Sequence, residues 1–224
     1  MKRKINLISL LLLIFLASCQ GKNHKNSKST LRIYTLPIDT AFIPKDSNQY
    51  YFPLDVFKDT SSFVGYERFV VSWYSKHLFA MKEPIFYADK SKNEIYRFTW
   101  LRTFNNPIAI RVEKHGDLYL LFWKLCDGAG GYEPGKLVIN KQKKIDKSTW
   151  NKLKNKINHI NFWDLNTHEK SSGSDGSRWI LEGKFQNQYN VVDRWTPNKK
   201  DKYYNCCDFI LGLTDLKINS DEKY

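Results

Sequence analysis

The segment Ser174–Pro197 constrains the fold of this chain most strongly, because it has the pattern of a β-hairpin. Two runs rich in Trp, Ile, Leu, Val and Tyr lie on either side of a polar tip at Gln186–Gln188. Asp175 and Gly176 supply the turn chemistry before the first run. The chain is therefore expected to build an antiparallel sheet, and the register of this hairpin decides which charged side chains share a face.

The hairpin allows two registers. A two-residue loop at Asn187–Gln188 would place Glu182 opposite Asp193. A three-residue loop centred on Gln188 would place Glu182 opposite Arg194 instead. The second register is favoured because it pairs opposite charges, which is worth about 0.2–1 kcal/mol, and because it gathers the aromatic side chains. One face would then hold Trp179, Leu181, Phe185, Tyr189, Val191 and Trp195.

In this register Asp193 points into the aromatic face, where its carboxylate needs a partner or its pKa rises. A structural anchor that ties a loop or helix terminus to the sheet is the favoured interpretation, since buried charges are usually paired. An acid or base in a pocket, with Glu182 and Arg194 at its rim, is the alternative. His168, in the polar loop before the hairpin, is a further catalytic candidate. The anchoring interpretation predicts that Asp193→Asn lowers thermal stability and that Glu182→Gln does not.

Residues 1–18 have the features of a bacterial lipoprotein signal peptide. Three basic residues, Lys2–Lys4, precede an apolar run that is too short for a comfortable membrane span. Leu16–Cys19 matches the lipobox, in which the cysteine thiol takes a diacylglyceryl group. Acyl chains on Cys19 would anchor the protein to the lipid bilayer, and the polar residues 19–30 would form a flexible tether. We therefore expect a membrane-anchored lipoprotein of the cell envelope, outside the cytoplasm.

The composition of the chain favours some classes of binding partner and excludes others. The formal net charge of +13 comes mostly from lysine and could favour anionic lipid headgroups or envelope polysaccharide. Nucleic acid is not an expected partner, because the compartment is wrong and Arg-aromatic interleaving of the base-reading kind is absent. The aromatic content of 15% fits a small β core packed from aromatic side chains. No cofactor is indicated.

Cysteine usage leaves two alternatives open. If Cys19 is lipidated, Cys126, Cys206 and Cys207 remain, and a bridge between the two neighbours would be strained. A disulfide between Cys126 and either Cys206 or Cys207 is possible in an oxidising envelope. Otherwise all three thiols are small buried hydrophobes. No zinc site is expected, since Cys-x-x-Cys and suitably spaced histidines are absent.

The chain after the tether is long enough for one domain with its own core. Residues 31–71 are interpreted as an irregular entry segment, 72–216 as an α+β domain and 217–224 as a tail. Period-two runs from Asn93 onward, joined by short turns, predict an antiparallel meander, and the hairpin after the second predicted helix adds to the sheet. Helices are predicted at Ser72–Glu83, from Asp146 or Ser148 to about Ile160, and at Tyr203–Leu216. The expected fold is a single α+β domain, an antiparallel sheet (meander plus hairpin) packed against two or three helices.

A glycine-rich segment, Asp127–Lys136, follows the third predicted strand. It imitates the start of a phosphate-binding loop. However, Leu137 stands where a Ser or Thr would hold magnesium, and a strand follows where a helix is required. A flexible rim loop that exposes its backbone is the better interpretation. Its candidate binding residues are Gly130, Gly131, Tyr132 and Glu133.

Several motifs between Ser72 and Leu216 resemble a family of uncharacterised bacterial lipoproteins and secreted proteins. The motifs are W-Y-S-K-H-L-F-A-M-K-E-P, Y-R-F-T-W-L-R-T-F, G-G-Y-E-P-G-K-L, D-G-S-R-W-I-L-E-G and V-V-D-R-W-T-P. The resemblance implies a family assignment and no activity. The family commonly places His after the hairpin Tyr, whereas this chain has Asn190, which weakens any role for an imidazole base there.

Two functions remain, and the sequence leaves open whether the protein is an enzyme. The favoured one is a non-catalytic envelope module that binds a glycan, peptide or protein through the loop at 128–135 and the hairpin rim; exposed aromatics around that rim would support it. The other is a hydrolase-like enzyme with Asp193 or Glu182 as acid or base and Arg194 stabilising negative charge. The favoured register puts Glu182 and Asp193 on opposite faces, which argues against a glycosidase pair.

Overall fold

The computed structural model describes residues 46–58, 65–169, 173 and 175–224. The predicted signal peptide at 1–18, the lipidation site at Cys19 and the tether at 19–30 lie outside the described residues. Everything described belongs to one compact unit, Pro37–Tyr224. Within the described ranges, no helix is both long enough and apolar enough to cross a membrane.

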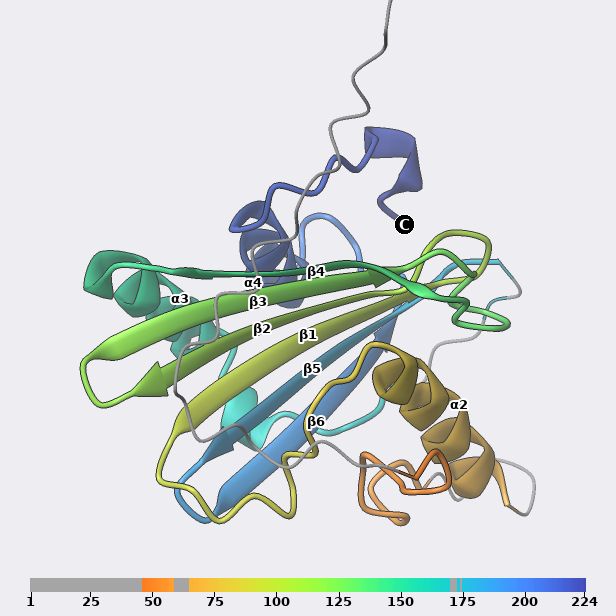
Figure 1. Cartoon of the computed structure of the whole chain (residues 1–224), viewed down its shortest axis with the longest axis horizontal. Coiled ribbons are helices and arrows are strands. Elements are labelled where there is room, and N and C mark those ends of the chain that lie inside the picture. The colour runs from red at the N-terminus through yellow and green to blue at the C-terminus, as the bar shows by residue number, and fades with distance from the viewer. Residues whose placement is uncertain (1–45, 59–64, 170–172, 174) are drawn as a thin grey trace, which may run out of the picture. The chain divides into compact units, whose positions relative to one another are not determined.

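The core element is a six-stranded sheet with the order β4-β3-β2-β1-β5-β6, in which all neighbouring strands are antiparallel (Figure 1). The first four strands form the predicted meander, and the predicted hairpin adds to it through pairing of β5 with β1. The strands are β1 (Glu94–Arg102), β2 (Ile108–His115), β3 (Leu118–Cys126), β4 (Leu137–Lys144), β5 (Ser177–Phe185) and β6 (Gln188–Trp195).

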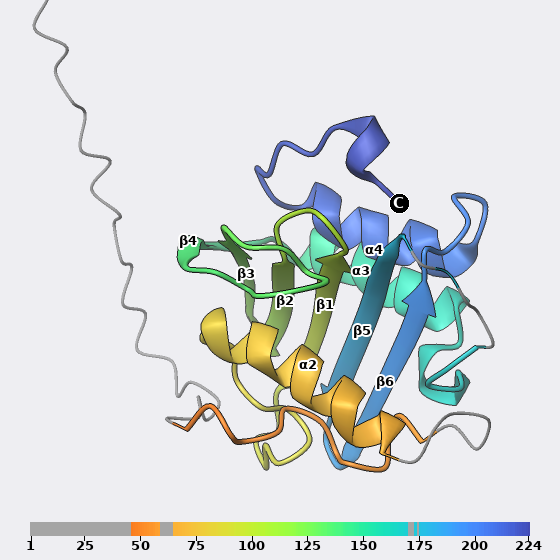
Figure 2. The ribbon, with the colours of Figure 1, turned by 90° about the vertical axis from the view of Figure 1, so that its right-hand side faces the viewer.

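Helices cover both faces of the sheet (Figure 2). One face is covered by α2 (Tyr66–Ala80), and the other by α3 (Lys147–His159) and α4 (Lys202–Gly212). Two short 3-10 helices, η1 (Phe162–Asp164) and η2 (Ser220–Glu222), complete the described secondary structure. The predicted α+β class, with a meander and a hairpin packed against helices, is confirmed.

The three helices differ from their predicted bounds at the ends. α3 begins where expected, because the Asp146 side chain accepts a hydrogen bond from Thr149 N at 2.6 Å. α2 begins at Tyr66 instead of Ser72, after Gly65 at φ 87°, so it starts inside the segment interpreted as irregular. α4 ends at Gly212 instead of Leu216, and its last turn is closed by i→i−3 bonds from Leu213 N to Ile210 O and from Thr214 N to Leu211 O.

Neither register considered for the hairpin is correct. Phe185 pairs with Gln188, so the loop is Gln186–Asn187, and Glu182 lies opposite Val191. A register chosen to gather apolar side chains on one face does not apply here, because both faces of this sheet are buried and both carry apolar side chains. As a consequence, Asp193 lies opposite Ile180 and shares the α2 face with Glu182, whereas the sequence interpretation put the two carboxylates on opposite faces.

The two faces of the sheet also decide the state of the cysteines. Cys126 packs in the core under α2, whereas Cys206 and Cys207 belong to the core on the α3 and α4 side. All three thiols are buried and free, as one of the two alternatives expected. The other alternative, a disulfide from Cys126 to Cys206 or Cys207, is not formed, because the sheet lies between the two groups. Burial raises the pKa of Cys126 to about 11, which leaves that thiol protonated.

The α2 side of the sheet contains a buried network of charges. Neighbouring strands each present one cation, and the three cations, Arg97 at 3.4 Å, Arg111 at 2.9 Å and Lys124 at 2.8 Å, surround the Glu83 carboxylate. Burial alone would raise the pKa of Glu83, but the three positive charges lower it to about 2. Arg97 also donates from Nε to Glu182 at 2.8 Å, and both side chains are fully buried.

Because Glu182 is fully buried, the expectation that Glu182→Gln leaves the thermal stability unchanged no longer holds. The substitution leaves the Arg97 guanidinium in the core without its main counter-charge, so we expect the free energy of unfolding to fall by about 3 kcal/mol. Urea denaturation would measure it. Glu133→Gln is the matched control, because Glu133 pairs with Lys76 in solvent and its loss should barely move the midpoint. Equal effects of the two substitutions would contradict the assigned network.

Candidate functional site

The three most exposed large apolar side chains of the described residues are all aromatic and belong to one region. Phe69, Phe104 and Tyr132 are exposed by 57%, 61% and 60%. Phe104 lies in the β1–β2 loop and Tyr132 in the β3–β4 loop, with ring centroids 6.3 Å apart. Phe69 lies on α2 beside Trp73, whose Nε1 donates to Gly130 O at 3.0 Å. We call Phe69, Trp73, Phe104 and Tyr132 the aromatic rim.

The loop that carries Tyr132 is tied to its neighbours by backbone hydrogen bonds. Gly130 N donates to Asn105 O at 2.9 Å, and Gly131 N donates to Thr103 O at 3.2 Å. Within the loop, Ala129 N donates to Glu133 O at 2.9 Å. The interpretation as a loop that exposes its backbone is therefore wrong, because these amides are used to attach the loop to the end of β1.

Glycine is required in this loop because two backbones meet there. A Cβ on Gly130 would lie 2.5 Å from Arg102 N, and one on Gly128 would lie 2.1 Å from Glu133 O. Such approaches are possible only without a side chain. The resemblance to a phosphate-binding loop therefore has a packing explanation.

The four predicted binding residues have two different roles. Gly130 is buried and Gly131 partly buried, so these two hold the loop in place. Tyr132 and Glu133 are exposed, and the Glu133 carboxylate pairs with Lys76 Nζ at 2.7 Å. The loop thus presents one aromatic ring and one carboxylate on a fixed backbone.

Sequence reasoning missed the other members of the aromatic rim. Strand alternation continued from Tyr96, Phe98 and Trp100 would put Phe104 on the buried face, but β1 ends at Arg102 and Phe104 follows in the loop. Trp73 lies one helical turn before the buried His77, yet it is only partly buried. The available signal was the phenylalanine directly before Asn105-Asn106-Pro107, a turn sequence that ends the strand.

The structure brings together two of the predicted catalytic residues, Asp193 and His168. The buried Asp193 carboxylate accepts a hydrogen bond from the Tyr74 hydroxyl at 2.8 Å, and His168 Nδ1 lies 3.7 Å from the same oxygen. Burial raises the pKa of Asp193, although the Arg178 charge opposes the shift. Asp193 N also donates to Thr167 O at 2.7 Å. These contacts join α2, a loop and β6, as the anchoring interpretation expects.

Arg194 holds the same loop from the opposite face of β6. Its guanidinium donates to Thr167 O at 3.0 Å and to Asn166 O at 3.1 Å, and its Nε lies 3.0 Å from the Glu169 carboxylate. Glu182 is separate from this loop and is engaged by Arg97 and by the Tyr189 hydroxyl at 3.0 Å. The geometry therefore supports structural roles for Asp193, Arg194 and Glu182 better than acid–base chemistry.

Two further findings bear on the site. Among the described residues, no group of three or more His, Cys, Asp and Glu side chains could hold a metal ion. No protein-family model matches the chain, and no curated protein matches it.

The close backbone contact of the rim loop gives a testable consequence. Gly130→Ala puts a methyl group against Arg102 N and Leu101 C, so we expect a loss of about 1–3 kcal/mol in the free energy of unfolding. Gly212→Ala is the control, because the added methyl group would meet no atom within 4 Å other than the adjoining backbone of its own helix, so α4 should tolerate it. A stable Gly130→Ala variant would show that the loop is not packed as described.

His77 gives the fold a pH dependence. It lies one helical turn after Trp73, is fully buried, and neighbours Lys76 and Glu133. Burial and the Lys76 charge lower the pKa of His77 from 6.5 to about 4, although Glu133 opposes the shift. As the pH falls from 6.5 towards 4, the unfolded chain takes up a proton that the folded chain does not. Stability is therefore lost over this window.

Because one pKa unit corresponds to about 1.4 kcal/mol, the His77 contribution approaches about 3 kcal/mol at pH 4. His77→Leu should remove it, so the variant should lose less stability than the parent between pH 7 and pH 4. Denaturation curves at several pH values would measure the difference. Parallel pH profiles for the two proteins would contradict the assignment.

Proposed function

We propose that this protein is a membrane-anchored envelope lipoprotein that binds a glycan through the aromatic rim. The observation that carries the proposal is the gathering, beside a loop fixed by backbone hydrogen bonds, of the three large apolar side chains that are most exposed among the described residues. Exposed apolar groups that cluster in this way mark binding surfaces, whereas isolated ones need no explanation.

The chemistry of the rim suits sugar rings. Aromatic rings have a negative face, which attracts the positively polarised C–H groups on the face of a pyranose. Phe104 and Tyr132 are inclined by 34° with centroids 6.3 Å apart, so they lie next to one another and do not stack. The neighbouring Glu133–Lys76 pair offers an acceptor and a donor to hydroxyl groups. Because the loop is already ordered, binding would cost little conformational entropy.

The cellular address rests on the order of residues at the start of the chain. Three basic residues, an apolar run and Leu16–Cys19 support a lipoprotein signal, with Cys19 as the acylated residue and 19–30 as the tether. The resemblance to uncharacterised bacterial lipoproteins agrees with this proposal. An anchored domain in the envelope would meet glycans at close range.

Binding to soluble polysaccharides tests the proposal. The full chain in detergent micelles is run in gels that contain a neutral glucan, xylan or mannan, and its retardation gives the affinity. We expect Phe104→Ala and Tyr132→Ala each to weaken binding about tenfold, equivalent to about 1.4 kcal/mol. Tyr87→Ala is the matched control, since Tyr87 is also exposed but lies against Tyr189 near the hairpin tip.

The competing ligand class is a peptide or protein. No retardation in any polysaccharide, with a parent protein that is folded, would refute the glycan and leave the rim to such a partner. If Tyr87→Ala weakens the retardation as much as Tyr132→Ala does, the aromatic rim is not the binding surface.

A further inference from the structure

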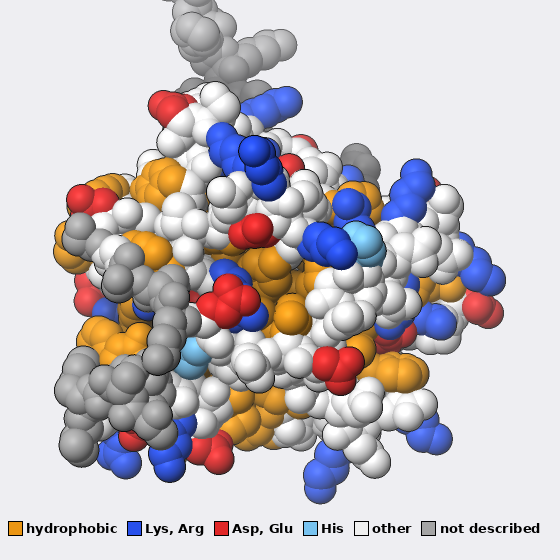
Figure 3. All heavy atoms as spheres, turned by 180° about the vertical axis from the view of Figure 1, so that it is seen from behind, with side chains coloured by type: hydrophobic (Ala, Val, Ile, Leu, Met, Phe, Trp, Pro, Cys, Tyr) orange, Lys and Arg blue, Asp and Glu red, His pale blue; other side chains and the backbone are white. Residues whose placement is uncertain are grey.

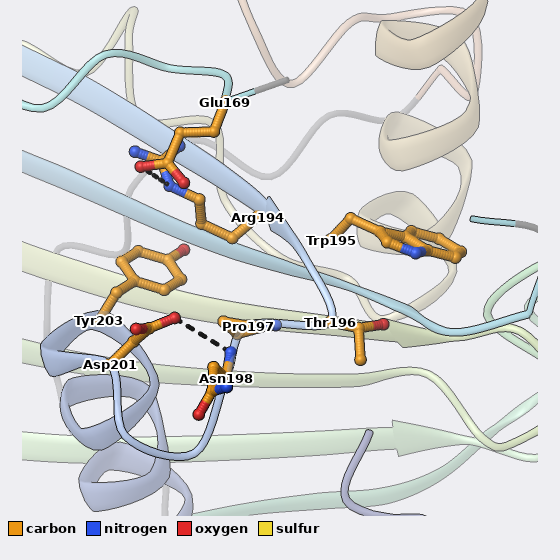
Figure 4. A pocket seen from close by; sticks show the side chains of 8 residues that line it. All are labelled: Glu169, Arg194, Trp195, Thr196, Pro197, Asn198, Asp201 and Tyr203. Carbon is orange, nitrogen blue, oxygen red and sulfur yellow. Dashed lines mark hydrogen bonds and ion pairs between the residues drawn. The ribbon is translucent and has the colours of Figure 1, made fainter. Parts of the chain in front are cut away.

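A second site opens beside Arg194, between the end of β6 and the start of α4. The cavity has a volume of about 330 Å³ (Figure 4). It lies on the α4 side of the sheet, the side seen in Figure 3, where charged side chains surround exposed apolar groups. The lining that matters for its chemistry is Glu169, Arg194, Thr196, Asn198, Asp201 and Tyr203. A volume at the lower end of ligand pockets suits one small ligand.

Arg194 does not act as an anion receptor in this cavity. Its guanidinium is occupied by Asn166 O, Thr167 O and the Glu169 carboxylate, and it lies over the Tyr203 ring at 5.6 Å. Arg194 therefore forms a fixed wall. Its positive charge is outweighed by two carboxylates, Glu169 and Asp201, so the charged lining is net negative.

The groups left for a ligand are acceptors. Asp201 uses Oδ2 to accept from Asn198 N at 3.0 Å, and Glu169 uses Oε1 for Arg194. Within the described part of the chain, the second oxygen of each carboxylate has no hydrogen-bond partner. Figure 4 shows the two carboxylates on different sides of the Tyr203 ring. Two separated acceptors are the arrangement that a molecule with several hydroxyl donors needs.

The wall of the cavity is also strained. Thr196 has φ 41°, a conformation that is unfavourable for a β-branched residue. Two hydrogen bonds with Ser177 keep it there: Thr196 N donates to Ser177 O at 2.8 Å, and Ser177 N donates to Thr196 Oγ1 at 3.0 Å. Backbone strain of this kind concentrates at ligand sites.

We propose that this cavity binds a single non-acidic sugar unit, with Glu169 and Asp201 accepting hydrogen bonds from its hydroxyl groups. Phosphorylated and uronic acid ligands are excluded by the negative lining, while a neutral or an amino sugar is admitted. The proposal goes beyond the glycan surface of the aromatic rim, because no residue is shared between the two sites.

Saturation-transfer NMR on the full chain in detergent micelles tests the proposal with methyl glucoside, glucosamine and glucuronate. We expect the first two to bind and glucuronate to bind at least tenfold more weakly. Asp201→Asn should weaken methyl glucoside binding at least tenfold. The variant should remain folded, because Asn is as good as Asp at the start of a helix.

Two controls separate this site from others. Asp208→Asn removes a carboxylate from the same helix that pairs with Lys223 and should leave methyl glucoside binding unchanged. Tyr132→Ala removes any binding that belongs to the aromatic rim, so Asp201→Asn should still weaken methyl glucoside binding at least tenfold in the Tyr132→Ala background. The proposal is overturned if glucuronate binds as well as methyl glucoside, if glucosamine alone binds, or if Asp208→Asn has the same effect as Asp201→Asn. Loss of binding in Tyr132→Ala alone would assign the sugar to the rim.

Discussion

Coverage of the sheet on both faces is the constraint on which the rest of the structure depends. Every residue of β1 is buried, including Glu94, Arg97 and Arg102. A charge in such a strand must find a counter-charge, because an isolated buried ion costs several kcal/mol. The counter-charges come from a distance in sequence: Glu182 for Arg97 and Glu222 for Arg102. The ion pairs thereby join the central strand to its neighbour β5 and to the end of the chain.

A rigid sheet then positions its loops. In an antiparallel sheet of this order, the end of β1, the end of β3 and the end of β6 meet at the same edge. The aromatic rim follows β1 and β3, and the cavity follows β6, so both proposed sites are built from loops at one edge. Between them, the Tyr224 hydroxyl donates to Asn105 Oδ1 at 2.6 Å, next to Phe104. Loops on a stiff scaffold are the usual place for binding residues.

The elements of the fold could be predicted from local pattern, and the contacts between them could not. Local signals located the meander from Asn93 onward and the helix after Asp146, since these signals lie within a few residues. The predicted hairpin register is wrong because gathering apolar side chains on one face identifies the register of a half-buried sheet, whereas this sheet is buried on both faces. The sequence could not decide whether a disulfide forms, because nothing in the spacing of Cys126 and Cys207 shows that the sheet separates them.

In the candidate site, too, local pattern identified single elements and could not predict the contacts between them. Gly130 and Tyr132 could be selected from sequence because a glycine-rich turn stands out, but their different roles depend on where β1 ends. Phe104 could not be recognised as exposed from alternation, which continues past the last residue of the strand. Sequence reasoning therefore located the loop and could not assemble the rim, which draws on α2 and two loops.

The central claim is that the glycine loop is fixed to the end of β1 and thereby holds Tyr132 in place. Amide hydrogen exchange of Gly130 and Gly131 tests it most directly, with the open turn at Gly116 as the unprotected reference. The account predicts that both amides exchange as slowly as those in the paired ends of β1 and β3. Exchange as fast as that of Gly116 would contradict it, because the loop would then be mobile and the aromatic rim would have no fixed geometry.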